Sequence, residues 1–284
     1  MSAATGAGGT DGAAGAAGPP VSVRRVLPDL LTAVAPPVGE RLIGVWLYGS
    51  AVTGSFDRGV SDIDVLIGIE GELDLDTDEL AAAHAQILRA HPGFRDRLDL
   101  TCAPAAALSG GLLHPLFVVS PGEPPHTVRV APRWALTRAL VRETGLTLAG
   151  RPAREALAPA DAGEVRLALV DSVAELRRRA PGVRHRGGHA YVVLTACRAL
   201  RALTAGELAD KGEAAAWTAE RWPRLRPLLA AALVWRRTQA VRDETPLPAE
   251  LVPLLGELLD LAAAAAVAEE THSERKHHRG ARDR

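Results

Sequence analysis

The sequence predicts an α+β domain, a mixed sheet with flanking helices, followed by an all-α helical bundle domain. Strand-like apolar runs alternate with helical patterns as far as residue 152, whereas residues 162–268 carry helical patterns throughout. The length of 284 residues also gives a prior of about two domains. We place the first domain at 21–155 and the second at 156–268.

Composition indicates a globular chain. Hydrophobic residues make up 47% of the sequence and charged residues 24%, which is neither a disordered nor a membrane-like composition. A net charge of -1 provides no broad basic surface for a nucleic-acid duplex, so we expect no nucleic-acid partner. A small-molecule or protein substrate is favoured instead.

Two sequence features bear on where the protein works. Cys102 and Cys197 both lie in apolar runs, where buried reduced thiols are expected rather than a disulfide. No N-terminal stretch combines a basic start with an apolar core and a cleavage site, and no apolar run reaches about 18 residues. We therefore expect a cytoplasmic protein with no membrane partner.

Both ends of the chain are predicted to be disordered tails. Residues 1–20 contain Ala, Gly, Ser, Thr and Pro with almost no large apolar side chain, so burial cannot repay the entropy of ordering them. Residues 269–284 are strongly charged and are expected to stay solvated.

Helical spacing predicts two helices in the first half of the first domain. Val and Leu residues at 23–35 recur with a helical period, which Pro36 and Pro37 are expected to end. Residues 76–90 carry an apolar stripe that begins at Leu80. The acidic start of this second helix suits the positive end of the helix dipole.

Two aspartates open a predicted strand. The apolar run 65–67 is preceded by Asp62, Ile63 and Asp64. Side chains at i and i+2 of a strand point to the same face, so the two carboxylates would lie side by side. Such a pair repels unless a cation lies between, and Mg²⁺ binds through one or two carboxylates plus substrate phosphates. A hairpin with an acidic face is the alternative interpretation.

A Gly-Ser pair ends the strand predicted at 45–48. A helix beginning near Ala51 would point its first backbone N–H groups at a phosphate. Gly49 lets the backbone approach a ligand closely, and Ser50 adds a hydroxyl donor.

A third carboxylate is expected from the next strand. Residues 97–103 alternate apolar and polar side chains, which predicts a strand that pairs beside the Asp62 strand. Asp99 lies among the polar side chains and therefore faces the same site. An exposed strand aspartate with no role is the alternative.

The remaining elements of the first domain are shorter. They are a strand at 115–119, a loop at 121–125, a helix at 133–142 and a strand at 146–148. Strand patterns stop after the turn at 150–152, which is why the domain boundary is placed there.

Five amphipathic segments follow, joined by short Pro or Gly turns as in an antiparallel bundle. They lie at 165–179, 190–203, 211–221, 225–242 and 251–268.

The motifs of the first domain resemble those of the polymerase-beta-like nucleotidyltransferase superfamily. The shared pattern is a strand, a Gly-Ser pair, an intervening loop, and Asp-hydrophobic-Asp-hydrophobic inside a second strand, here LYGSAVTGSFDRGVSDIDVLI. The resemblance implies a nucleotidyltransferase domain at 21–155. It also implies that the third carboxylate, Asp99, acts either as a metal ligand or as the base that takes the acceptor proton.

The chain is further similar to the aminoglycoside 3''/9 adenylyltransferase family, the streptomycin and spectinomycin resistance enzymes. Two more stretches carry this likeness, WALTRALVRETGLTLAGRP and YVVLTACRALRALTAGELADKGEAAAWTAERWP, and the second lies in the C-terminal helices. The resemblance implies transfer of AMP from ATP to an antibiotic hydroxyl.

Matching positions imply roles for individual residues. Asp62 and Asp64 match the magnesium-binding aspartates, with two Mg²⁺ ions expected. Gly49 and Ser50 match the loop that contacts the triphosphate, and Ser61 matches the residue before the metal pair.

Lys211 matches a lysine that reaches from the helical domain to the nucleotide phosphates. The chain has 33 Lys and Arg residues in total, and all except Lys211 and Lys276 are arginine. A lysine inside the folded region therefore stands out. A solvated lysine at a helix start is the alternative.

The chain departs from the family pattern in two places. Asp99 stands where the family has a glutamate base, so base and metal-ligand roles both stay open. The turn at 184–189 is basic, whereas streptomycin-type enzymes have aspartates there. A polycationic acceptor needs acidic partners. Spectinomycin, which is smaller and less charged, is therefore favoured over streptomycin.

We expect a monomer that binds ATP and a small hydroxylated acceptor between its domains. Two other functions use the same fold. One is an antitoxin-type nucleotidyltransferase that modifies a protein, although such enzymes are shorter and lack the helical domain. The other is a nonenzymatic nucleotide sensor, which has no need to hold three carboxylates together.

Overall fold

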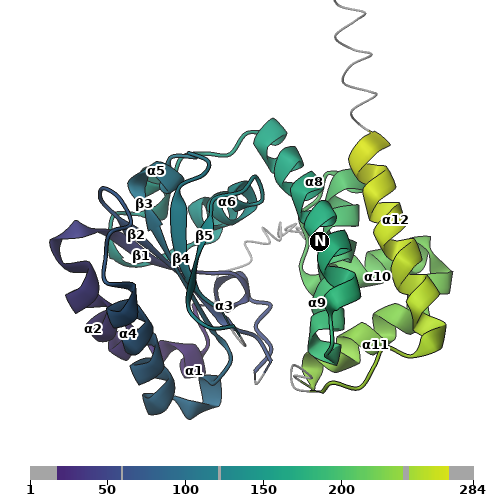
Figure 1. The fold of residues 1–284 in the computed structure, drawn as a ribbon, viewed down its shortest axis with the longest axis horizontal. Helices are drawn as coiled ribbons and strands as arrows, with labels where there is room; N and C mark the ends of the chain where they lie inside the picture. The colour runs from purple at the N-terminus through teal and green to yellow at the C-terminus, as the bar shows by residue number, and fades with distance from the viewer. Residues whose placement is uncertain (1–17, 59, 121–122, 239–242, 269–284) are drawn as a thin grey trace, which may run out of the picture.

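A computed structural model shows a sheet domain beside a helical domain (Figure 1). The structure describes residues 18–58, 60–120, 123–238 and 243–268. Most of the expected N-terminal tail and all of the C-terminal tail, at 1–17 and 269–284, lie outside this part of the chain. The predicted fold class, a mixed sheet with flanking helices followed by a helical domain, is confirmed.

Within the described residues, the sheet has six strands in the order β5-β4-β3-β2-β1-β6. Their bounds are Leu42–Tyr48 (β1), Ile63–Ile69 (β2), Leu98–Pro104 (β3), Pro115–Val119 (β4), His126–Arg129 (β5) and Leu146–Gly150 (β6). Only β2 and β3 pair in parallel, and the other neighbours are antiparallel. A parallel pair needs a crossover connection, which α4 (Thr77–Ala90) supplies.

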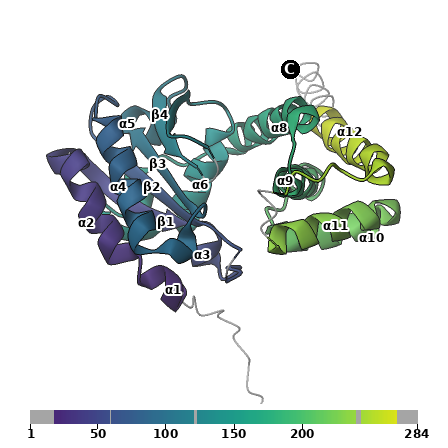
Figure 2. The same ribbon diagram turned by 60° about the horizontal axis from the view of Figure 1, so that its bottom comes forward.

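One face of the sheet is covered by the N-terminal helices. Helices α1 (Val21–Arg24), α2 (Leu27–Val38) and α4 lie on this side, with α2 and α4 side by side in Figure 2. Alternate residues of the strands, such as Val65 and Leu100, fill the core beneath them. The predicted alternation therefore holds, because apolar side chains of β2 and β3 point to this core and the aspartates point away.

Helix α2 differs from its prediction at both ends. Pro36 and Pro37 lie inside its last turn instead of ending it, and the helix stops at Val38 before Gly39. Proline removes backbone hydrogen bonds but keeps a helical φ. The last turn survives because Val34 and Val38 are buried against the sheet domain.

The opposite face carries α5 (Ala105–Leu108), α6 (Trp134–Thr144) and α7 (Ala153–Ala156). Trp46 is fully buried here and its indole N–H donates to the carbonyl of Arg151 at 2.9 Å. Sequence analysis missed α5, α7 and β5, because elements of four residues are too short to show a period.

The second domain contains the five predicted helices. They are α8 (Ala162–Arg179), α9 (Arg186–Ala205), α10 (Lys211–Arg221), α11 (Arg226–Arg237) and α12 (Val252–Ala268). The helix predicted at 225–242 ends at Arg237, and its last positions, 239–242, lie outside the described residues. Helix α9 begins at Arg186, earlier than predicted, because the His185 ring nitrogen accepts a hydrogen bond from the Gly188 N–H.

Helix α9 lies at the centre of the bundle and packs against α8, α10, α11 and α12. The bundle joins the sheet domain through α6 and α8, where buried Arg138 pairs with Glu164 and Arg133 pairs with Asp171 at 3.2 Å. The structure thus brings one side of α9, α10 and α11 towards the ends of the strands that carry the aspartates. The domain bounds 21–155 and 156–268 stay predictions.

Helix α12 is unusually apolar. The segment Ala249–Ala268 has a mean hydropathy of 1.8 and would be long enough to cross a membrane. In the fold, however, Leu255, Leu258 and Ala262 are buried in the bundle core. A single helix of this kind is weak evidence for a membrane span, because a core helix has the same composition.

Candidate active site

Three acidic and phenolic side chains form a row across the sheet. Asp64 of β2 is in register with Asp99 of parallel β3 and with Tyr48 of antiparallel β1. Asp62 directly precedes β2. Strand register thus sets Asp64 beside Asp99. Asp62 is near enough for its charge to raise the pKa of both. The Ser120 hydroxyl donates to the Asp99 Oδ2 atom at 2.8 Å.

Gly49 brings the backbone against the Asp64 carboxylate. Its φ is +70°, and a Cβ atom at this position would lie 2.3 Å from the Asp64 Oδ2 atom. Only glycine combines a left-handed backbone with this close approach. Ser50 follows as the first residue of α3 (Ser50–Thr53), a single turn whose N–H groups at Val52 and Thr53 donate to the Gly49 carbonyl.

Ser61 is buried and has a local partner. Its Oγ atom accepts a hydrogen bond from the Asp57 N–H at 2.9 Å, and its carbonyl accepts one from Arg97 Nη1 at 3.2 Å. The Ile63 N–H in turn donates to the Arg97 carbonyl at 2.8 Å. Ser61 therefore holds the segment that leads into Asp62, while its contact with a triphosphate stays a prediction.

The carboxylates are strongly perturbed by their surroundings. Burial raises the pKa of Asp64 to about 8, with added repulsion from Asp99 and Asp62 and opposition from Lys211 and Arg198. Burial also raises the pKa of Asp99 to about 6, although the hydrogen bond from Ser120 lowers it. The pKa of Asp62 is raised by burial and lowered in part by Lys211, Arg97 and Arg236. Burial thus opposes ionisation of all three carboxylates, and a bound cation would favour their charged forms.

Lys211 comes from the helical domain to this site. It is the first residue of α10, whose N-cap Asp210 accepts from the Glu213 N–H at 2.8 Å. Its Nζ atom lies 5.8 Å from the ring centroid of Tyr191. Burial lowers the pKa of Lys211, as do Arg236 and Arg198, while Asp62 and Asp64 raise it. The predicted lysine is thus within electrostatic reach of the predicted carboxylates.

Two arginines join Lys211. Arg198 of α9 donates from Nε to the Ala209 carbonyl at 2.9 Å, and its charge lowers the pKa of Asp64. Arg236 of α11 donates from Nη1 to the Asp57 Oδ2 atom at 2.7 Å. Sequence analysis missed both, because arginine is the common basic residue of this chain and its identity marks no position.

Tyr48 and Ser120 were also missed. Tyr48 could have been found, since it shares the strand face of Asp64 one residue before Gly49. Burial raises the pKa of Tyr48 well above its usual range, and Asp64 and Asp99 raise it further. It therefore stays a neutral phenol beside the carboxylates. Ser120 had no local signal, because β4 brings it to Asp99 only through strand pairing.

Within the described ranges, no three His, Cys, Asp or Glu side chains lie close enough together to hold a metal ion unaided. Mg²⁺ does not require such a cage, because it usually binds through one or two carboxylates with water and substrate phosphates. Asp62 and Asp64 supply carboxylate oxygens, and burial raises the pKa of both, so a bound cation would favour their charged forms. The donor set therefore fits Mg²⁺ bound together with a nucleotide.

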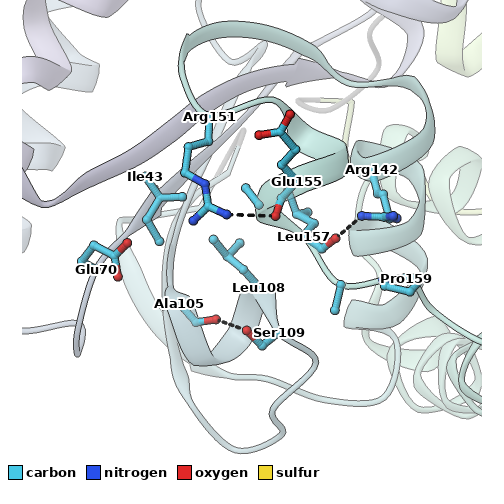
Figure 3. Close-up of a pocket in the computed structure, with 12 residues that line it drawn as sticks. Ile43, Glu70, Ala105, Leu108, Ser109, Arg142, Arg151, Glu155, Leu157 and Pro159 are labelled. Atoms are coloured by element: carbon cyan, nitrogen blue, oxygen red, sulfur yellow. Dashed lines mark hydrogen bonds between the residues drawn. The ribbon is translucent and has the colours of Figure 1, made fainter.

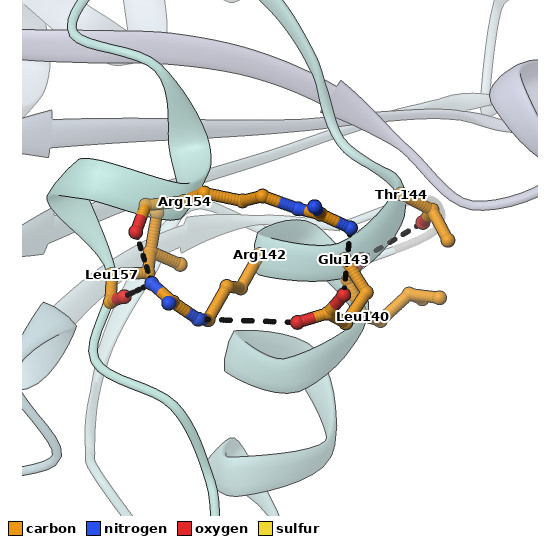
Figure 4. A network of polar contacts seen from close by, with 6 residues as sticks. All are labelled: Leu140, Arg142, Glu143, Thr144, Arg154 and Leu157. Carbon is orange, nitrogen blue, oxygen red and sulfur yellow. Dashed lines mark hydrogen bonds and ion pairs between the residues drawn. The ribbon is translucent and has the colours of Figure 1, made fainter.

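A separate pocket of about 390 Å³ lies at the other end of β1 and β2 (Figure 3). Two arginines line it, but both are engaged by nearby carbonyl groups. Arg142 donates to the carbonyls of Arg154 and Leu157 (Figure 4), and Arg151 donates to that of Glu155 at 3.1 Å. None of the predicted site residues lines this pocket, so it is distinct from the candidate active site.

Comparison with known proteins gives matches for both domains. The family model described as nucleotidyltransferase domain matches residues 30–104, and that described as aminoglycoside adenylyltransferase, C-terminal domain, matches residues 155–260. No curated protein matches the chain.

A solved structure, the spectinomycin adenyltransferase AAD(9) from Enterococcus faecialis with ATP and spectinomycin, has a similar fold. Its TM-score is 0.64 at 17% sequence identity, and the similarity covers 86% of this chain and 98% of that chain.

The two family models match different domains, in the order that the sequence resemblance implied, and the solved structure shows the same arrangement of sheet and helices. The carboxylates lie on the domain matched by the nucleotidyltransferase model, and Lys211 lies on the other. The chain is therefore a nucleotidyltransferase and belongs to the aminoglycoside adenylyltransferase family.

Proposed function

We propose that this nucleotidyltransferase moves AMP from ATP to a hydroxyl group of a small molecule and releases pyrophosphate. The observation that carries the proposal is the meeting of three carboxylates of the sheet domain, Asp62, Asp64 and Asp99, with two cations of the helical domain, Lys211 and Arg198. A polyphosphate needs positive partners, and a hydroxyl nucleophile needs a base. This arrangement offers both.

Asp99 is the proposed general base. Its pKa of about 6 leaves it ionised at neutral pH yet basic enough to accept a proton. Ser120 donates to one carboxylate oxygen, Oδ2, and so orients the group. Asp99 takes the acceptor hydroxyl proton while the hydroxyl oxygen bonds to the α-phosphorus. The bond from that phosphorus to the bridging oxygen breaks, and pyrophosphate leaves.

Asp62 and Asp64 are the proposed ligands of Mg²⁺. Bound there with the nucleotide, the ion would neutralise phosphate charge and polarise the α-phosphate. Asp64 is fixed in β2 by its pairing with Tyr48 and Asp99, and the charge of Asp62, which directly precedes the strand, raises the pKa of Asp64. Gly49 contributes by leaving room for the Asp64 carboxylate against the backbone.

Lys211 and Arg198 are the proposed partners of the triphosphate. Both come from the helical domain, so the nucleotide would lie between the domains and contact both. Their positive charges would offset the charge that develops on pyrophosphate as it leaves, which is a positioning and electrostatic form of catalysis.

Spectinomycin is the proposed acceptor in preference to streptomycin. The turn before α9 carries Arg184, His185 and Arg186. Arg186 lies over the Trp235 ring at 5.6 Å and pairs with Asp243 at 3.6 Å. The turn at 184–189 itself contains no carboxylate, so it lacks the acidic partners that a polycationic acceptor needs. The structural neighbour that binds spectinomycin supports the same choice.

The test is pyrophosphate release from ATP and Mg²⁺, with spectinomycin, streptomycin and other hydroxylated compounds offered separately. We expect release with spectinomycin and none with streptomycin. The variant with both Asp62→Asn and Asp64→Asn should lose at least about 10³-fold in turnover. The control is Asp260→Asn, an exposed aspartate of α12, which should behave like wild type. Turnover near wild type in the double variant would refute the metal assignment.

A further inference from the structure

An ion pair joins the two domains beside the candidate active site. Arg236 of α11 and Asp57, which lies between α3 and β2, are 179 positions apart in sequence, yet Nη1 and Oδ2 approach to 2.7 Å. The Arg236 side chain is 22% exposed and that of Asp57 is 52% exposed. The pair is therefore partly shielded from solvent on the arginine side.

The backbone of Asp57 is a centre of hydrogen bonds. Its carbonyl accepts from the N–H groups of Val60 at 3.0 Å and Ser61 at 2.9 Å. Its own N–H donates to the Ser61 Oγ atom at 2.9 Å. Ser61 directly precedes Asp62 in the chain, so the hydrogen bonds between Asp57 and Ser61 constrain the backbone position of Asp62.

Arg97 holds the same segment from the sheet side. It donates to the Ser61 carbonyl at 3.2 Å and stacks over the Phe94 ring at 4.9 Å. Arg236 holds the same segment from the helical domain, through its contact with the Asp57 carboxylate. Its charge reaches both Asp62 and Lys211, which come from different domains.

We propose that Arg236 is a positioning residue that, through its ion pair with Asp57, sets the place of Asp62 relative to Lys211. Arg236 acts through Asp57 rather than on the nucleotide itself. The expected effect on ATP binding rests on the proposed function. The ion pair and the hydrogen bonds of Asp57 can be tested without any acceptor or nucleotide.

The first test is hydrogen exchange in the free protein. Arg236→Gln should speed exchange at the amides of Asp57, Val60 and Ser61, because these N–H groups depend on a fixed Asp57. The matched control is Arg133→Gln, which removes another ion pair between the domains, with Asp171, away from the aspartates. The control should leave those three amides unchanged. Unchanged exchange in Arg236→Gln would overturn the proposal whether or not the protein transfers AMP.

The second test is a double-mutant cycle on the dissociation constant of ATP with Mg²⁺. Arg236→Gln and Asp57→Asn should each weaken binding by about fivefold, the upper range for a partly exposed pair. Because both act through one contact, the double variant should also be about fivefold weaker rather than additive. Arg236→Lys should recover part of the loss.

Two outcomes of the cycle would overturn the proposal. Additive losses would mean that Arg236 contacts the nucleotide directly, and a silent Asp57→Asn beside a weakened Arg236→Gln would mean the same. If wild type itself binds no ATP, the proposed function fails, while the exchange experiment still decides whether Asp57 is held by Arg236.

Discussion

Asp64 and Asp99 face each other as register partners on the two parallel strands of the sheet. Burial raises the pKa values of the two carboxylates to about 8 and about 6, and the charge of Asp99 raises the pKa of Asp64 further. Carboxylates with strongly shifted pKa values cluster at functional sites, where they bind a cation or transfer a proton.

The position of Gly49 should tolerate no side chain. Gly49→Ala adds a Cβ atom 2.3 Å from the Asp64 Oδ2 atom at a φ of +70°, so Asp64 or the backbone must shift. We expect a loss of about 1–3 kcal/mol in the free energy of unfolding and a large loss of turnover.

Gly54→Ala is the matched control for Gly49. Its φ is also positive, at +83°, but nothing lies within 4 Å of the added atom. Gly54→Ala should lower the free energy of unfolding but leave turnover unchanged. Chemical denaturation and initial rates measure the two effects, and equal losses of turnover in both variants would contradict the argument from Asp64.

The rate should follow the ionisation of Asp99. A base must be unprotonated, so kcat/KM should rise with pH through about 6 and then level off. The hydrogen bond from Ser120 lowers the pKa of Asp99, so Ser120→Ala should move this rise to higher pH.

Ser109→Ala removes a hydroxyl that donates to the Ala105 carbonyl, far from the aspartates, and should leave the pH profile in place. A profile that is identical in wild type and Ser120→Ala would argue against Asp99 as the titrating base.

The stability of the protein without metal should fall with rising pH because of Asp64. The folded chain keeps a proton on Asp64 up to about pH 8, whereas an unfolded aspartate loses it near its ordinary pKa of about 3.9. The folded state thus binds more protons in this window, and the free energy of unfolding decreases across it. Asp64→Asn cannot ionise, so it should melt about 2–4 °C above wild type at pH 8.

This gain should shrink towards pH 4, where both chains are uncharged at the position. Added Mg²⁺ should stabilise wild type and have little effect on Asp64→Asn. Thermal unfolding at the two pH values checks both points, with Asp260→Asn as the exposed control. An Asp64→Asn variant that melts below wild type at pH 8 would contradict the prediction.

Lys211 should act on ATP binding through its charge. Lys211→Ala should raise the KM for ATP by about tenfold or more, because a phosphate loses a charged partner. Lys211→Arg keeps the charge with a different shape and should be intermediate. Arg221→Ala, at the other end of α10, removes a cation that lies over Trp217 and should not change KM. Initial rates at varied ATP give the answer.

Local patterns predicted most of the architecture. Alternation placed the aspartates of β2 and β3 on one face, because a strand has a period of two residues that is visible in the chain. Helical spacing predicted the five helices of the second domain, with α10 at Lys211–Arg221 as expected. Resemblance to a known family then supplied roles for Gly49 and Lys211 that no period reveals.

Local patterns failed where packing overrides propensity. Pro36 and Pro37 were expected to end a helix that instead continues to Val38, because burial of the last turn outweighs two missing hydrogen bonds. The four-residue elements β5, α5 and α7 have too few positions to show a period.

Strand alternation and motif spacing are local, so the sequence alone predicts that three carboxylates and a Gly-Ser turn belong to one site, and the family resemblance adds a lysine to it. The other groups around these residues could be identified only from the folded chain. Arg198, Arg236 and Ser120 reach the aspartates from other helices and another strand. Their contacts depend on how distant segments pack, and an arginine among many arginines carries no local sign of that.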